Sequence, residues 1–82
     1  MENERVLLKQ FGRHLVELRR RHVISQERLA LESGVSRSYM SGIERGVRNI
    51  SLTKICELAN ALGVPPATLV QFGDSKNGSK PP

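Results

Sequence analysis

Cysteine, long apolar segments and aromatic residues are all scarce in this sequence. Cys56 is the single cysteine, so no disulfide can form within the chain. No apolar run approaches the roughly 20 residues that span a bilayer. Nothing at the N-terminus resembles a charged segment followed by an apolar signal sequence. These absences predict a cytoplasmic protein that does not enter a membrane.

The scarcity of aromatic residues limits what the core can be made of. The sequence has no tryptophan, one tyrosine and two phenylalanines, so leucine, isoleucine, valine and alanine must supply most of the core, which suits packed helices. The 82 residues suffice for one domain but leave no room for a separate ligand-sensing or catalytic domain. We expect this domain to span residues 1–73. Residues 74–82 should form a flexible tail, because no apolar residue anchors them.

Groups that perform catalysis or bind metal ions are also missing. No nucleophile, base and orienting group line up along the chain, and no glycine-rich phosphate loop occurs. His14 and His22 are eight residues apart, with no cysteine or acid at ligand spacing. Cys56 is predicted to lie on the apolar face of a helix, where a cysteine is most often an inert part of the core. We therefore expect no enzymatic activity, no metal, no cofactor and no small-molecule effector.

Positive charge, in contrast, is plentiful and unevenly distributed. The net charge is +5. Residues 12–48 contain eight arginines and four glutamates, so four of the five net charges lie in this segment. A polyanion would be attracted to it. Charge alone, however, also fits a solvated basic surface.

Apolar residues recur at helical spacing, and the sequence has no strand pattern and no internal repeat. Leu8, Phe11, Leu15 and Leu18 share one face of a helix predicted over residues 4–21. Serine caps, glycine ends and a proline start delimit four more helices. These run from Ser25 to Gly34, from Ser36 to Gly46, from Ser51 to Gly63, and over residues 65–72. The predicted fold class is all-α, a compact five-helix bundle.

The second and third predicted helices carry the functional signal. Residues 26–45 read QERLALESGVSRSYMSGIER, two short helices joined through Gly34 and Val35. This arrangement is typical of a helix-turn-helix, which presents its second helix to the DNA major groove. Met40 and Ile43 should face the core. The opposite face is polar or small, and comprises Arg37, Ser38, Ser41, Gly42 and Arg45.

Together these segments resemble the Cro/C1-type (XRE-like) helix-turn-helix family, which includes phage repressors and the controller proteins of restriction-modification systems. The resemblance covers residues 8–72. It is carried by LRRR, SQERLA, SGVSRSYMSGIERG and ISLTKICELANALGV, in this order and at the family's spacing. It implies a bundle of the lambda-repressor-like DNA-binding type. The SRSY and VRN segments look more like those of controllers than of phage repressors.

The resemblance also implies roles for individual residues. Gln26 would contact phosphate and brace the recognition helix, and Arg19 would form a buried ion pair with Glu44. The first helical turn after Ser36 would reach base edges. The implied DNA-binding set is Gln26, Ser36, Arg37, Ser38, Tyr39, Ser41, Arg45, Arg48 and Asn49. Val23 and Ile50 depart from the family, which commonly has glycine and proline there.

Several alternatives remain open at this point. Tyr39 could fill space between helices instead of contacting DNA, and Arg37 could be a solvated surface residue. We expect a homodimer on a palindromic operator of double-stranded DNA, paired through Leu69, Val70 and Phe72, which offer more apolar surface than a short helix can bury alone. The competing function is an antitoxin-like protein-interaction module with secondary DNA binding. RNA binding is disfavoured, because only Tyr39 could stack on a base.

Overall fold

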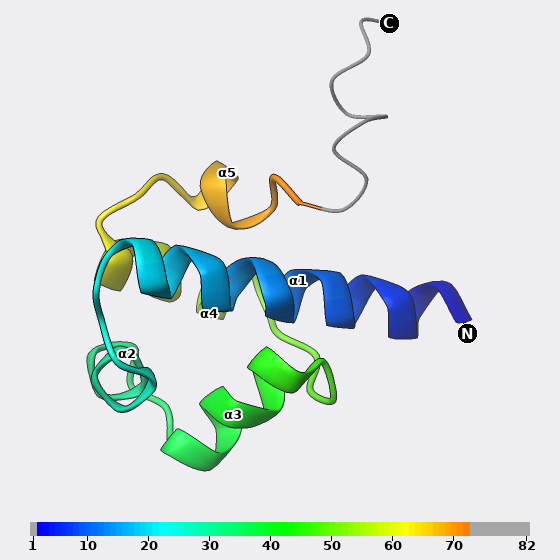
Figure 1. Cartoon of the computed structure of the whole chain (residues 1–82), viewed down its shortest axis with the longest axis horizontal. Coiled ribbons are helices and arrows are strands. Elements are labelled where there is room, and N and C mark those ends of the chain that lie inside the picture. Colours follow the sequence, from blue (N-terminus) through cyan, green and yellow to red (C-terminus); the bar gives the residue numbers. More distant parts are fainter. Residues whose placement is uncertain (1, 73–82) are drawn as a thin grey trace, which may run out of the picture.

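The computed structural model describes residues 2–72, which form five helices and no strand (Figure 1). The helices are α1 (Glu2–Arg21), α2 (Gln26–Glu32), α3 (Arg37–Arg45), α4 (Leu52–Leu62) and α5 (Pro66–Leu69). The predicted all-helical fold is therefore confirmed, and each helix lies close to its expected position. The predicted tail, residues 74–82, lies outside the described residues.

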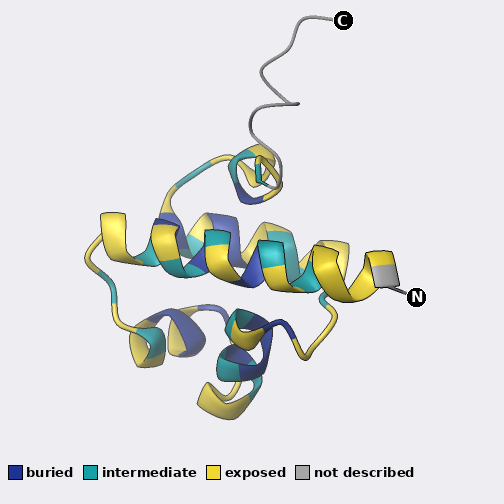
Figure 2. Ribbon diagram, turned by 45° about the vertical axis from the view of Figure 1, so that its right-hand side comes forward, coloured by how far each residue is buried: buried dark blue, intermediate teal, exposed yellow. Residues whose placement is uncertain are grey.

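Helix α1 runs through the middle of the molecule, with α5 on one side and α2 and α3 on the other (Figure 1). Its buried residues lie along the middle of the helix, and both its ends are exposed (Figure 2). One continuous core joins the helices. It consists of Phe11, Leu15, Leu18, Leu29, Ala30, Met40, Ile43, Leu58, Ala59, Leu62 and Leu69.

Serine side chains begin three of the helices, as the sequence predicts. The Ser25, Ser36 and Ser51 hydroxyl oxygens accept hydrogen bonds from main-chain N–H groups three residues further on, at 3.0–3.1 Å. Each bond satisfies an amide that has no partner within its helix. These caps fix the first residue of α2, α3 and α4, and therefore the direction in which α3 leaves the turn.

The turn after α1 contains a strained residue. Val23 has φ +52°, and it is the only residue other than glycine with positive φ among the described residues. This conformation disfavours a β-branched side chain. The side chain is 91% exposed, so packing does not compensate for the strain. The resembled family commonly has glycine at this position. Val23 therefore adopts a backbone conformation that glycine adopts easily.

The prediction that Cys56 belongs to the core is wrong, because its side chain is exposed. Helix α4 buries a narrow stripe made by Leu58, Ala59 and Leu62. Cys56 lies to one side of this stripe, and so does Leu52, which is 76% exposed. The apolar composition of the segment therefore suggests a wider buried face than α4 has.

Candidate nucleic-acid interface

Helices α2 and α3 form the predicted helix-turn-helix. Gly34 adopts φ +72°, and the Val35 N–H donates to the Ala30 carbonyl at 3.0 Å, which closes the turn. Ala30 is 2% exposed at the contact between the two helices. Because this side chain is small, the two helices can lie close together.

Helix α3 turns its apolar side inward and its polar side outward. Met40 and Ile43 are buried in the core, as predicted. Arg37, Ser38 and Arg45 are exposed on the surface of α3. Ser41 is half-buried, and its hydroxyl accepts a hydrogen bond from the Arg45 Nε at 3.4 Å. The outward surface of α3 is therefore polar and positively charged.

Gly42 does not belong to this outward face, and its predicted exposure is wrong. The residue is buried, and a Cβ atom at this position would lie 2.6 Å from the Arg48 Cγ. The chain after α3 folds back across the helix, because the Val47 N–H donates to the Gly42 carbonyl at 2.9 Å. The absence of a side chain at Gly42 makes the space in which Arg48 lies.

Tyr39 connects α3 to the loop that follows it. The Arg48 guanidinium lies 5.7 Å from the centre of the Tyr39 ring, which is cation–π contact distance. The Tyr39 hydroxyl donates to the Asn49 carbonyl at 3.3 Å. The ring is half-buried and packs against the core. Tyr39 thus fills the space between helix and loop, and it also holds Arg48 and Asn49, both exposed, beside the outward face of α3.

Ile50 occupies the other position that departs from the family. Its N–H donates to the Asn49 Oδ1 at 2.7 Å, and its side chain packs against the core. A proline has no N–H to donate. Asn49 therefore stabilises this loop with its own side chain, where the resembled family would use a rigid ring.

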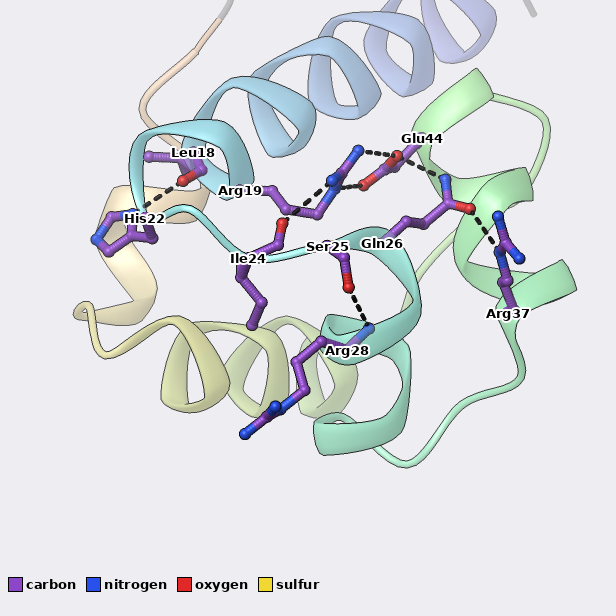
Figure 3. A network of polar contacts seen from close by, with 9 residues as sticks. All are labelled: Leu18, Arg19, His22, Ile24, Ser25, Gln26, Arg28, Arg37 and Glu44. Atoms are coloured by element: carbon purple, nitrogen blue, oxygen red, sulfur yellow. Dashed lines mark hydrogen bonds and ion pairs between the residues drawn. The ribbon is translucent and has the colours of Figure 1, made fainter.

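A largely buried ion pair joins α1 to α3, where the resemblance implies a buried one (Figure 3). The Arg19 Nε donates to the Glu44 Oε2 at 2.7 Å, and the Arg19 Nη2 donates to the Glu44 Oε1 at 3.2 Å. A third donor, Nη1, bonds the Ile24 carbonyl at 3.2 Å. The two side chains are 15% and 6% exposed. This paired geometry specifies orientation in addition to adding energy.

The same carboxylate positions Gln26 (Figure 3). The Gln26 Nε2 donates to the Glu44 Oε1 at 2.8 Å, and the Gln26 Oε1 accepts from the Arg37 Nε at 3.5 Å. Gln26 therefore links the buried pair to the first residue of α3. The brace that the resemblance implies for Gln26 is present in this geometry.

Two glycines bring α1 against α3: Gly46, which was predicted only as a helix end, and Gly12, which the sequence analysis did not single out. A Cβ atom at Gly12 would lie 2.7 Å from the Ile43 carbonyl oxygen and still closer to that of Glu44. A Cβ atom at Gly46 would lie 2.7 Å from the Lys9 Cα. Glycine within a helical pattern was the available signal for Gly12, since it usually has a packing reason.

The predicted dimer residues have different environments. Leu69 is completely buried in the core, so the prediction that it offers surface to a partner is wrong. Helix α5 has four residues, and its leucine is the part that attaches it to the domain. Phe72 is half-buried, with its ring 5.7 Å from that of Phe11 in an edge-on arrangement. Val70 is 51% exposed, as is Leu7.

Val70 and Leu7 border an apolar hollow between α1, α4 and the end of the described chain. Its lining residues are Leu7, Leu8, Phe11, Asn49, Ile50, Ile55, Val70 and Phe72. Asn49 is the only polar side chain among them. The exposed apolar surface near α5 therefore includes the start of α1, which the sequence analysis did not consider.

The two histidines bond main-chain carbonyls. The His14 Nε2 lies 2.7 Å from the Thr68 oxygen, and the His22 Nδ1 lies 2.8 Å from the Leu18 oxygen. Within residues 2–72, no group of three or more His, Cys, Asp or Glu side chains could hold a metal ion. No helix in this part of the chain is long and apolar enough to cross a membrane.

Comparison with known proteins gives consistent matches. A helix-turn-helix family model matches residues 15–69. Control protein C.BamHI from Bacillus amyloliquefaciens is 44% identical over 63 residues, which cover 76% of this chain and 78% of that protein. The structure of the restriction-modification controller protein C.AhdI from Aeromonas hydrophila has a TM-score of 0.72 at 52% identity, over 77% and 94% of the two chains. The hypothetical transcription factor NHTF from Neisseria has a TM-score of 0.77 at 32% identity, over 90% and 82%.

Proposed function

The chain belongs to the helix-turn-helix family of DNA-binding transcriptional regulators, and we propose that it acts as a homodimer on a palindromic or pseudo-palindromic operator. Its membership in this family was predicted from the sequence and is confirmed. The observation that carries the proposal is the outward face of α3, which is polar, positively charged and free of acidic residues. Arg37, Ser38 and Arg45 are exposed on it while Met40 and Ile43 anchor the helix from behind.

In this proposal α3 enters the major groove of the operator. Arg37 lies in the first helical turn, the part of a recognition helix that contacts base edges. Its guanidinium can donate two bonds to guanine O6 and N7, which discriminates against a wrong base by about 1–3 kcal/mol. Ser38 and Tyr39 share this turn. The remaining predicted contacts, to phosphates and the groove margin, are Gln26, Ser36, Ser41, Arg45, Arg48 and Asn49.

We propose dimerisation because one domain of this size makes few base contacts. Two copies related by a two-fold axis would place their α3 helices in successive major grooves, roughly 34 Å apart. Val70 and Phe72 remain candidates for the interface, and the exposed Leu7 beside them extends it. Burying these apolar side chains against a second copy would stabilise the dimer.

The similar proteins suggest the biological role. C.BamHI is named as a control protein and C.AhdI as a restriction-modification controller protein. We propose an autoregulatory role of the same kind, with the protein's own concentration acting through dimerisation and site occupancy. A cytoplasmic location and the absence of catalytic activity are part of this proposal. The antitoxin-like alternative is not favoured, because the relatives are regulators of transcription.

Footprinting on the DNA upstream of the protein's own gene, at several salt concentrations, tests this proposal. We expect two protected half-sites, about one helical turn apart and related by two-fold symmetry. Random DNA of the same length is the control. Protection that is no stronger on upstream DNA than on random DNA would overturn the proposed regulator, and protection of one half-site alone would overturn the dimer.

A further inference from the structure

The first turns of α1 lie beside the C-terminal end of α3. Gly46, which ends α3 in the left-handed conformation with φ +78°, allows this approach. A Cβ atom there would lie 2.7 Å from the Lys9 Cα and 3.0 Å from its main-chain nitrogen. Because main-chain atoms make this contact, the position of Lys9 relative to the end of α3 is fixed.

A shallow hollow marks this junction. Its lining residues are Glu4, Arg5, Leu8, Lys9, Gly46 and Val47. Arg5 and Lys9 are four residues apart and therefore lie on one side of α1. Both are exposed, and they share this hollow with the residues that follow α3. Their side chains thus extend from the side of α1 that faces α3.

None of the ion pairs among the described side chains involves Arg5 or Lys9. In the described part of the chain, the ion pairs join Arg19 to Glu44, Arg28 to Glu32 and Lys54 to Glu57. Glu4 also lines the hollow, but it forms no ion pair there. The chain on either side of Gly46 adds Arg45 and Arg48, both exposed. Basic side chains from two separate segments therefore lie near the end of α3, and Glu4 is the one acidic residue that lines the hollow.

We propose that Arg5 and Lys9 form a second DNA-backbone contact, which binds phosphates next to the groove that α3 enters. This inference rests on the proposed function. A basic side chain that contacts a phosphate increases the affinity for DNA, because each contact releases condensed counterions. Phosphate contacts also fix the orientation of a protein on the duplex. The start of α1 would thus set the orientation in which α3 enters the groove.

The salt dependence of DNA binding by the full chain tests this site. The variant is Arg5→Gln/Lys9→Gln. The matched control is Arg13→Gln/Arg21→Gln, which removes the same charge from the same helix. Arg13 and Arg21 are exposed and line a hollow with residues of α5, on the side of α1 opposite α3 (Figure 1). Thermal unfolding of each variant establishes that it is folded.

For two lost phosphate contacts, the slope of log Kobs against log salt should become shallower by about 1.8 per protomer. For the proposed homodimer this is about 3.6 in total, so the affinity ratio of wild type to Arg5→Gln/Lys9→Gln should fall about 150-fold between 50 mM and 200 mM salt. The control should keep the wild-type slope. Equal slopes for wild type and Arg5→Gln/Lys9→Gln, or equal losses in both double variants, would overturn the second contact. Wild type that fails to prefer upstream DNA over random DNA would instead overturn the proposed function.

Discussion

Gln26 joins Glu44 to Arg37: its amide nitrogen donates to the Glu44 carboxylate at 2.8 Å, and its amide oxygen accepts from the Arg37 Nε at 3.5 Å. The carboxylate accepts hydrogen bonds only, so it fixes which end of the amide turns outward. The outward end is an acceptor, which suits the guanidinium of Arg37. A buried ion pair in the fold thus reaches the first residue of α3 through one side chain.

Replacing Glu44 tests the energetic side of this link. Glu44→Ala leaves the Arg19 guanidinium, 15% exposed, without its carboxylate. Removing one partner of a buried ion pair destabilises a protein by about 3–5 kcal/mol. We expect a loss of this size in the free energy of unfolding, measured by urea denaturation.

The control for Glu44→Ala is the exposed pair of Arg28 and Glu32 on α2. Glu32→Ala should lower stability by less than about 1 kcal/mol, because exposed ion pairs contribute little. Similar losses for the two variants would contradict the structural role assigned to Glu44.

Val23→Gly should stabilise the domain. The positive φ of Val23 disfavours an L-residue by about 1–2 kcal/mol, whereas glycine adopts it freely. Glycine is also more flexible in the unfolded chain, which offsets part of this stabilisation. We therefore expect the free energy of unfolding to rise by about 1 kcal/mol, visible as a higher melting temperature. Val23→Ala keeps a Cβ atom and should gain much less. A lower melting temperature for Val23→Gly would show that the turn is not strained.

Leu69 and Val70 are neighbours with separate predicted effects. Leu69→Ala should lower the free energy of unfolding by about 2–5 kcal/mol, because the side chain is completely buried.

Val70→Glu should leave the melting temperature of the monomer nearly unchanged, because Val70 is 51% exposed. It should, however, shift sedimentation toward monomer. A Val70→Glu protein that sediments as wild type does would remove Val70 from the interface.

Periodicity, serine caps and glycine ends predicted the five helices, because these signals are local and each has a direct physical cause. The errors arose where burial depends on how a helix packs against residues outside it. The exposure of Cys56 follows from how narrow the contact of α4 is, and the burial of Gly42 follows from Arg48 folding back over α3. Leu69 is buried because α5 packs on both α4 and α1, an arrangement that no local pattern reveals.

The outward face of α3 was predicted from helical geometry for Arg37, Ser38 and Arg45. The network around Gln26 was predicted in part, because the resemblance implied the pair of Arg19 and Glu44. The role of Tyr39 in holding Arg48 could not be predicted, since a loop conformation has no periodicity. The contact of Lys9 with Gly46 could not be predicted either, because the two residues lie far apart in the sequence and no helical pattern relates them.

Arg48→Ala should weaken binding to operator and random DNA alike. The Arg48 guanidinium lies 5.7 Å from the centre of the Tyr39 ring, beside α3, and we propose that it contacts phosphate there. The loss of one phosphate contact should make the salt slope shallower by about 0.9 per protomer. An effect confined to the operator would instead assign Arg48 to base recognition. Fluorescence anisotropy on both DNAs, over a range of salt concentrations, makes the comparison.

The central claim is that the outward face of α3 reads DNA sequence, and the affinity of Arg37→Ala for operator and random DNA tests it most directly. We expect a loss of about 1–3 kcal/mol on the operator, which corresponds to roughly 5- to 150-fold in Kd, and nearly unchanged affinity for random DNA at the same salt concentration. Equal losses on both DNAs, or no loss on the operator, would contradict the claim.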